Sequence, residues 1–290
     1  MYEGSLFHRI CTVEIGEAGK EGNNFGGLRT KFNIKKNIQS TANQGTIELY
    51  NLNATSRGFL DGFAEKKDTK KTAKSTKFEK LVCILKAGYK GITVDEENLD
   101  IIFSGDIYRV SHEKKGVDII TTLECGDSQR KLTETHIEQS FKAGTKNKKI
   151  IEYVVEKLGL TIGRQVKLSD IEYSKGLTIT GNITEIMDTL TEREDVNWHV
   201  QDGVVYIDDD TFTAEQEKKA IVIAKNTGLI GLPILREKGL EVISLLQPSI
   251  KPGKFIKLES SIKEGFFKVR EAVYEGDTLD GNWQVRLIVE

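Results

Sequence analysis

The stretch Thr46-Ile47-Glu48-Leu49-Tyr50 alternates polar and apolar side chains. Successive side chains of a β-strand point to opposite faces of its sheet, so this pattern predicts a strand with one face in a core and one in water. Ile119-Ile120-Thr121-Thr122-Leu123 also combines polar and apolar residues in one segment. Both stretches indicate a sheet with one wet face, which is typical of antiparallel β structure.

Outward from these two stretches, further strands are predicted before residue 132, each bounded by Gly, Asn, Asp or Lys-rich turns. The candidate strands are 6–15, 28–34, 45–49, 80–87, 100–110 and 117–124. A closed or nearly closed barrel packs such strands with no exposed edge. We therefore expect residues 1–132 to form an N-terminal β-barrel domain with a mobile Lys-rich insertion at residues 64–80, whose alternative role is a basic finger for phosphate or an acidic partner.

Helical spacing replaces strand alternation in residues 133–224. A linker from Thr133 leads to a first amphipathic helix, which Gly159 ends, and Asn182 caps a second helix with Glu185 as its capping-box partner. The two apolar stripes are Ile151, Val154, Val155 and Leu158, then Ile183, Ile186, Met187 and Leu190. Asp202-Gly203 suits a type I′ turn between two short strands. The expected unit is a small helix-helix-hairpin domain.

Residues 225–290 return to strands, predicted at 240–246, 254–258, 266–274 and 283–289. Pro248 and Pro252 frame one turn, and Gly276-Asp277 marks another. So short a β segment needs a neighbour, so we expect a C-terminal β-barrel domain that packs on the first. The fold class is mainly β with an α+β insert: two β-barrel, tube-like domains plus the small helix-helix-hairpin domain.

The balance of charge argues against a DNA-coating protein. The 290 residues carry 42 Lys and Arg against 44 Asp and Glu, a formal net charge of -2. The first residues lack a basic region followed by an apolar stretch, and no apolar run is long enough to span a bilayer, so we expect neither secretion by signal peptide nor membrane insertion. Cys11, Cys83 and Cys125 lie among apolar neighbours and are expected as buried free thiols.

No motif predicts catalytic, cofactor or metal chemistry, so we expect no enzyme and no cofactor. The four histidines and three cysteines lack the short spacings of zinc ligands. Asp208-Asp209-Asp210 alternates between faces and lacks the Ca²⁺ loop pattern, which favours a solvated strand end. Ser128 has no identifiable base, and the glycines near Gly16 are spaced wrongly for a phosphate loop.

Several C-terminal segments together resemble phage tail baseplate hub proteins. They are Thr227-Gly228-Leu229-Ile230-Gly231-Leu232-Pro233, residues 245–253, Gly265-Phe266-Phe267-Lys268-Val269, and Gly276-Asp277 before Trp283. Upstream, Tyr50-Asn51-Leu52-Asn53, Ala87-Gly88-Tyr89 and Phe103-Ser104-Gly105-Asp106-Ile107 resemble the first barrel of that family. The order of these segments carries the resemblance, which extends over most of the chain.

The resemblance implies a contractile-tail hub: a homotrimeric ring that adapts the hexameric tail tube to the trimeric central spike and lets DNA pass. Its partners would be the tail tube protein and the spike protein, with the tape measure protein or a tail lysozyme as further partners and no specific nucleic-acid binding. The protein would reside in the virion tail baseplate after assembly in the host cytoplasm. The fold-signature positions are Pro248, Pro252, Gly253, Gly265, Gly276, Asp277 and Trp283, all structural.

Two other functions stay open from the sequence. Aromatic residues of the small domain, expected to be exposed, favour a module that binds cell-wall glycan; they are Tyr173, Trp198 and Tyr206. The acids Glu192, Glu194 and Asp195 suggest a tail-associated peptidoglycan hydrolase, although clustered carboxylates at a helix end usually form a solvated face.

Overall fold

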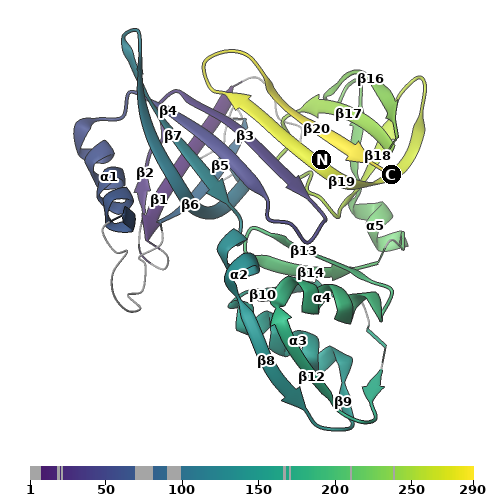
Figure 1. The fold of residues 1–290 in the computed structure, drawn as a ribbon. Helices are drawn as coiled ribbons and strands as arrows, with labels where there is room; N and C mark the ends of the chain where they lie inside the picture. Colours follow the sequence, from purple (N-terminus) through teal and green to yellow (C-terminus); the bar gives the residue numbers. More distant parts are fainter. Residues whose placement is uncertain are drawn as a thin grey trace.

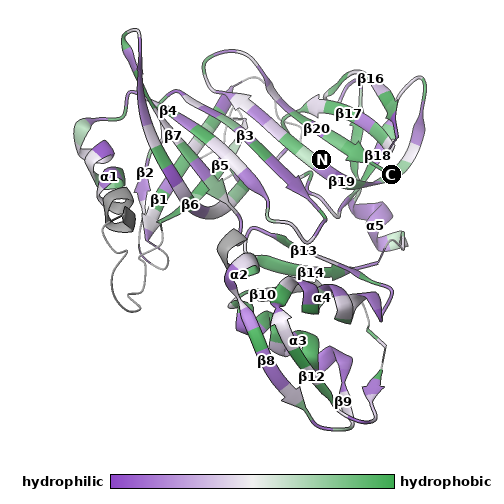
Figure 2. Ribbon diagram, viewed as in Figure 1, coloured by the Kyte–Doolittle hydropathy of each residue, from purple (hydrophilic) through white to green (hydrophobic). Residues whose placement is uncertain are grey.

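The computed structural model describes residues 8–17, 20, 22–68, 81–89, 99–165, 168–169, 171–209, 211–237 and 239–290. Figure 1 shows a broad layer of strands above a smaller α+β region, with the β13–β14 hairpin at their boundary. The strands of both parts of the broad layer alternate hydrophobic and hydrophilic residues in Figure 2, as the wet-faced strands predicted from the sequence require.

The first half of the layer is antiparallel. It contains β1 (Arg9–Glu17), β2 (Asn23–Asn24), β3 (Thr30–Asn37), β4 (Gln44–Tyr50), β5 (Leu81–Tyr89), β6 (Asp100–Lys115), β7 (Asp118–Gly126) and the helix α1 (Ala54–Asp68). The first five residues of the predicted Lys-rich insertion 64–80 are the end of α1, and residues 69–80 lie outside the described part of the chain.

The α+β region consists of short sheets and two packed helices. In order it has α2 (Gln129–Glu134), β8 (His136–Phe141), β9 (Thr145–Lys146), α3 (Asn147–Leu158), β10 (Thr161–Gln165), β11 (Glu172–Tyr173), β12 (Leu177–Asn182), α4 (Ile183–Glu192), β13 (Asn197–Gln201) and β14 (Val204–Asp208). The apolar stripes of α3 and α4 share one core with the β13–β14 hairpin, as their spacing predicts.

The predicted ends of these helices hold, with one change. Gly159 follows α3 in the left-handed conformation, and Asn182 caps α4. The Asn182 side chain accepts its bond from the backbone of Thr184 rather than Glu185, so the capping box is not formed. The predicted linker from Thr133 is wrong, because His136–Phe141 forms β8 and pairs with β12.

The second half of the layer follows α5 (Ala214–Lys219). Its strands are β15 (Ile221–Ala224), β16 (Leu229–Arg236), β17 (Gly239–Leu245), β18 (Phe255–Glu259), β19 (Glu264–Asp277) and β20 (Trp283–Val289). Strand β3 of the first half pairs with β19 of the second, from Asn37 opposite Glu271 to Lys31 opposite Asp277.

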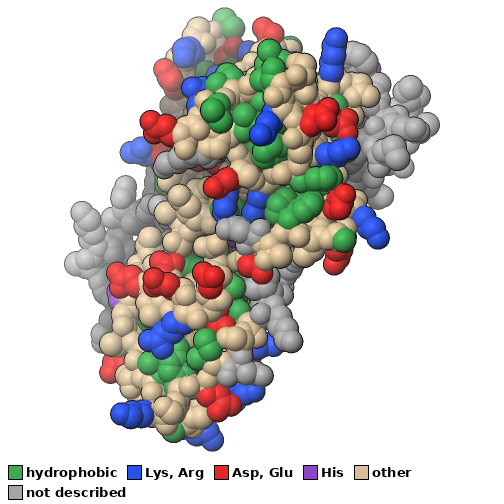
Figure 3. Space-filling model, turned by 90° about the vertical axis from the view of Figure 1, so that its right-hand side faces the viewer, with side chains coloured by type: hydrophobic (Ala, Val, Ile, Leu, Met, Phe, Trp, Pro, Cys, Tyr) green, Lys and Arg blue, Asp and Glu red, His purple; other side chains and the backbone are tan. Residues whose placement is uncertain are grey.

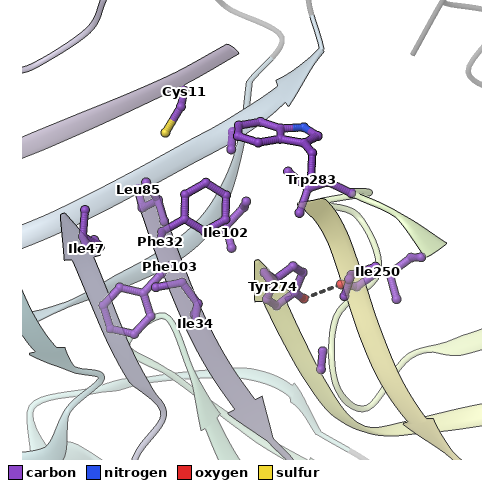
Figure 4. Packing of buried hydrophobic residues seen from close by; sticks show 14 of the residues in the cluster. Cys11, Phe32, Ile34, Ile47, Leu85, Ile102, Phe103, Ile250, Tyr274 and Trp283 are labelled. Carbon is purple, nitrogen blue, oxygen red and sulfur yellow. Dashed lines mark hydrogen bonds between the residues drawn. The ribbon is translucent and has the colours of Figure 1, made fainter. Parts of the chain in front are cut away.

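This pairing corrects the expectation of two barrels. The layer is one 13-stranded sheet with the main path β16-β17-β20-β19-β3-β4-β7-β6-β5-β1-β2, and the described residues contain no closed barrel. The edge strand β3 of the first half forms its hydrogen bonds with β19 of the second half, so neither half closes into a barrel of its own. One core accordingly spans both halves, and Figure 4 shows Phe32 of β3 lying between the first half and Trp283 and Tyr274 of the second.

The two halves have the same internal strand order. The first runs β3-β4-β7-β6-β5-β1 and the second runs β16-β17-β20-β19-β18-β15. The β6–β7 ladder shifts register between Ile107 and Arg109, and the β19–β20 ladder shifts between Val269 and Glu271. The halves differ at one end, where β5 is antiparallel to β1 while β18 is parallel to β15.

Aligning the two bulges matches β6 with β19 residue by residue. Ile107 then corresponds to Val269, and His112 corresponds to Tyr274. The correspondence extends to side chains, because His112 and Tyr274 each bond to the equivalent connection of their half, which links β4 to β5 in the first half and β17 to β18 in the second. His112 contacts Asp61 of α1 at 3.0 Å, and the Tyr274 hydroxyl donates to the carbonyl of Ile250 (Figure 4). The chain thus contains two structurally equivalent units.

Candidate functional site: the joints and outer face of the sheet

The joint between β3 and β19 gathers three of the residues singled out from the sequence. A Cβ atom on Gly276 would lie 2.2 Å from Cζ of Phe32, so only glycine allows the Phe32 ring to lie across β19. Trp283 covers that ring edge-on, with 5.4 Å between centroids. Close approach at Gly276 therefore fixes how the two halves meet.

Asp277 forms an ion pair across the same joint. Its carboxylate accepts two bonds from the Arg29 guanidinium, at 3.2 and 2.8 Å, and its carbonyl accepts one from Arg9. Burial opposes ionisation of Asp277, but the bonds from Arg29 and from the backbone of Leu279 and Asp280 outweigh it and lower its pKa. Asp277 thus ties the end of β19 to two segments of the first half.

The other predicted positions lie elsewhere in the second half. Pro248 and Pro252 bracket the connection between β17 and β18, and Gly265 lies near the start of β19, against the Phe267 ring. Gly253 has φ 82° and donates its N–H to the Val269 carbonyl. A Cβ at Gly253 would lie 3.2 Å from the His199 ring, so Gly253 lets the α+β region approach.

The tip of the β13–β14 hairpin inserts between the two halves. Asp202 has φ 54° and Gly203 has φ 81°, as the predicted type I′ turn requires. Asp202 lies 2.6 Å from Nζ of Lys36, whose side chain is fully buried, and 3.7 Å from Nζ of Lys251. Its carboxylate also accepts a bond from the backbone of Ser104. One side chain therefore contacts three distant segments of the large sheet.

Asp127 completes this buried polar cluster. Its carboxylate accepts the backbone N–H groups of Asp202 and Gly203 at 2.6 and 3.0 Å. Burial raises the pKa of Asp127, and the neighbouring Asp202 raises it further, while burial lowers the pKa of Lys36. Asn43 and Gln201 extend the cluster through bonds to Val200 and Asn37. No sequence pattern singles out Lys36, Asn43 or Asp127, because their partners lie far away along the chain.

The outer face of the sheet is wet and charged. Along β3 and β19 the inward residues are buried, whereas the alternate residues Lys31, Asn33 and Lys35 are exposed. Charges on this face pair across strands: Lys35 with Glu271 at 3.2 Å, Arg109 with Glu124 at 3.4 Å, Arg236 with Glu241 at 2.8 Å and Arg286 with Glu275 at 3.8 Å. Locally neutralised cations leave little charge to retain phosphate.

An apolar edge borders this face. The strand β16 pairs only with β17 among the described strands and exposes Ile230, Leu232, Ile234 and Leu235, at 37, 60, 46 and 82% of their surface. Figure 3 shows the side of the molecule on which β16 lies, where apolar side chains gather over the upper, strand-rich part. Long apolar edges are a liability unless another strand covers them.

The side chains proposed for glycan binding do not form an exposed platform. Trp198 is buried, and its indole N–H donates to Asp188 at 2.6 Å. Tyr173 donates to Asn147, and Tyr206 stacks on His199. The expectation of exposed aromatics is therefore wrong for Trp198, since it completes the core of the α+β region.

The acids considered for hydrolysis serve the structure or point into an open cleft. Glu194 accepts bonds from Asn147 and from the backbone and side chain of Ser169. Burial alone would raise its pKa, but these bonds lower it, which is the opposite of a general acid. Glu192 and Asp195 line a cleft of about 1760 Å³ between α4 and the second half of the sheet.

The predicted solvated strand end at Asp208 is instead bonded within the protein. Asp208 and the carbonyl of Asp209 bind the buried Lys268.

Three further properties concern the described residues. They contain no group of three or more His, Cys, Asp or Glu that could hold a metal ion. Of the helices described, none has the length and apolar character to cross a membrane. The three cysteines are buried and free, in β1, β5 and β7, as predicted.

Solved structures with a similar fold include two tail proteins and a type VI secretion component. A 43 kDa tail protein of the prophage MuSo2 from Shewanella oneidensis has a TM-score of 0.63 at 10% identity, over 97% of this chain and 98% of its own. A tail protein from Neisseria meningitidis has a TM-score of 0.60 at 9% identity, over 97% and 96%. The Escherichia coli c3393 protein, a type VI secretion component similar to the T4 tail proteins gp27 and gp5, has a TM-score of 0.55 at 11% identity, over 95% and 76%.

The chain thus shares its fold with tail proteins and a type VI secretion component. A family model described as Baseplate hub gp41 matches residues 11–267, and the chain belongs to that family, a structural component of the phage tail. The resemblance read from the sequence is confirmed. A comparison with curated proteins finds no match.

Proposed function

We propose that three copies of this chain form a ring that adapts the hexameric tail tube to the trimeric central spike and lets DNA pass. The observation that carries the proposal is the pair of equivalent units within one chain, joined edge to edge through β3 and β19. Three chains then present six similar units to a six-fold partner, while the ring as a whole keeps three-fold symmetry for the spike.

The division of the chain follows from this role. Residues 1–132 and 225–290 supply the two tube-facing domains, to the second of which β15 (Ile221–Ala224) also belongs. The small domain lies between them in the sequence, within residues 133–224. The Asp202 cluster fastens the small domain to both units, which supports a rigid adaptor. The fold-signature residues keep a structural role: Gly276, Asp277 and Trp283 at the joint, and Pro248, Pro252, Gly253 and Gly265 in the second unit.

The outer face of the sheet suits a DNA channel. Its lysines and arginines pair with glutamates across strands, so DNA would release few counterions by binding there and would not be retained. The protein would act by assembly in the host cytoplasm, without turnover, and would reside in the baseplate of the virion. Its partners would be the tube and spike proteins, with the tape measure protein or a tail lysozyme as further contacts.

Light scattering on the purified full chain tests the assembly. The proposal predicts a mass of three times 32.5 kDa for the assembled species. It also predicts that the trimer binds the tube and spike proteins encoded with it, in separate mixtures and at different faces. A chain that stays monomeric alone and with both partners contradicts the proposal.

A further inference from the structure

The joint inside the chain defines how two units connect. β18 pairs with β19 up to Lys268, and β3 then takes the same side of β19 from Glu271 to Asp277. The far side of β19 stays paired with β20 throughout this stretch. The joint therefore needs two features. One unit must supply an edge strand, as β3 does, and the other must supply a long strand whose second half is not paired by its own unit, as β19 does.

Both features recur at the unused ends of the two units. β16 corresponds to β3 in strand order, and its outer edge has no partner strand among the residues described. β6 corresponds to β19, and its pairing with β5 ends at Asp106. Residues Arg109–Lys115 of β6 continue along β7 on one side, with no strand on the other in the described part of the chain. One chain thus has two unpaired edges among the residues described. The edge of β16 corresponds to that of β3, and the edge of β6 corresponds to the part of β19 that pairs with β3.

We propose that β16 of one copy pairs antiparallel with residues 109–115 of β6 in a second copy, as β3 pairs with β19 within the chain. This inference rests on the proposed ring, because it names the contact that closes it. The interface is heterologous: each copy contributes β16 to one neighbour and β6 to the other. Three such contacts form a closed ring when each copy is rotated by a third of a turn from the last.

The matched ladders fix the register of this contact. Ile34 lies opposite Gly45, which faces Cys125 and then Ile107; Leu235 lies opposite Leu240, which faces Val289 and then Val269. Leu235 is therefore the counterpart of Ile34. Since Ile34 pairs with Tyr274, Leu235 pairs with the Tyr274 counterpart, His112 of the second copy. Ile234 then faces Glu113 on the outer, channel side.

Burial supports this choice of occupant. Pairing would cover Ile234 and Leu235, which are 46 and 82% exposed in the single chain. The exposed residues of β16 include no charge before Arg236, and edge strands that stay exposed in solution usually carry inward charges, lysine or short length. The segment has one proline, Pro233, within a bulge that breaks its ladder with β17 between Ile230 and Ile234.

Disulfide trapping tests the register in the full-length protein. Ile234→Cys combined with Glu113→Cys places two thiols directly opposite each other across the proposed joint, at a separation that a disulfide spans. Mild oxidation should yield covalent dimers and trimers on a non-reducing gel. Ile234→Cys combined with Thr46→Cys is the matched control, because Thr46 lies on the same outer face but within the paired interior of the sheet.

The outcomes separate this inference from the proposed function. Trimers that form covalent links only with the Ile234–Glu113 pair support the joint. Trimers by light scattering that give no such links overturn the joint while the ring stands, and a chain that remains monomeric overturns both. Ile234→Glu, which would face Glu113 with like charge, should raise the concentration needed for half-assembly by about tenfold. Ile262→Glu, at an exposed apolar residue on another hairpin, should leave that concentration unchanged.

Discussion

Asp202 and Lys36 lie 166 positions apart in the sequence and in different regions, yet their carboxylate and ammonium groups are 2.6 Å from each other in a site where the lysine is fully buried. The pair holds the hairpin of the α+β region between the two halves of the sheet. Its energetics decide whether the three regions behave as one body.

Removing one partner of this pair should destabilise the protein strongly. Asp202→Asn keeps a side chain that tolerates the left-handed backbone but removes the ion-pair partner of the buried Lys36 ammonium group. We expect a loss of about 3 kcal/mol or more in the free energy of unfolding, measured by urea titration. The double variant Lys36→Met with Asp202→Asn should recover part of the loss.

Lys35→Met provides the control for that experiment. Lys35 is adjacent in sequence but exposed on the outer face, where it pairs with Glu271. Its loss should cost less than about 1 kcal/mol. Equal losses of stability from Lys35→Met and Asp202→Asn would contradict a stabilising role of the buried Asp202–Lys36 pair.

His199 should make stability depend on pH in the acidic range. Burial, the largest cause, lowers its pKa from 6.5 to about 4, against the opposing influence of Asp208. The unfolded chain therefore binds more protons than the folded chain between these values, so this contribution is complete above pH 6.5 and is lost as the pH falls to 4. The loss is about 3 kcal/mol.

His199→Leu should remove that part of the pH dependence. The measurement is the free energy of unfolding of both proteins at several pH values from 7 to 4, with the difference between them plotted against pH. A difference that stays constant with pH would show that the pKa of His199 is the same in the folded and unfolded chains, which would contradict the effect of burial.

Gly276→Ala should weaken the joint between the halves. The added methyl group would meet the Phe32 ring, which Trp283 and the core hold in place. We expect a loss of about 1–3 kcal/mol by denaturant titration, reduced when Phe32→Leu is combined with it. Gly58→Ala in α1 is the matched control, because nothing lies within 4 Å of its added Cβ and alanine favours helices. Destabilisation by Gly58→Ala as large as that by Gly276→Ala would count against a steric cause.

The three thiols should react slowly in the folded protein. Cys11, Cys83 and Cys125 are buried, and burial raises the pKa of Cys11 to about 12. A chromogenic disulfide reagent at pH 8 should find almost no reactive thiol in buffer and all three in denaturant. Rapid reaction in buffer would contradict the packing of β1, β5 and β7.

The sequence predicts local features that short-range physics controls. Alternation in Thr46–Tyr50 gives β4, the stripe from Ile151 to Leu158 gives α3, and Asp202-Gly203 gives the hairpin tip. Each depends on residues within one turn or one strand. The residues of β16 do not predict a strand by themselves, because Gly231 and Pro233 interrupt the pattern of a strand at a place where the ladder with β17 is irregular.

The arrangement between segments could not be predicted in the same way. Alternation specifies which face of a strand is buried but not which strand lies beside it. The sequence therefore predicts two separate barrels, whereas β3 and β19 join the two halves in one sheet. Lys36 appeared as one of many lysines, since its role depends on Asp202 and on burial by distant strands. The sequence predicts Trp198 on the surface, although it is buried, because nothing in a short strand's sequence shows to which face an aromatic side chain points.

An electron microscopy reconstruction of the purified assembly tests the central claim most directly. We predict a three-fold ring with an open channel, lined by the outer face of the sheet that carries Lys35 and Glu271, and with six similar units around it. A compact particle without a channel, or a ring whose channel is lined by another surface, would contradict the account.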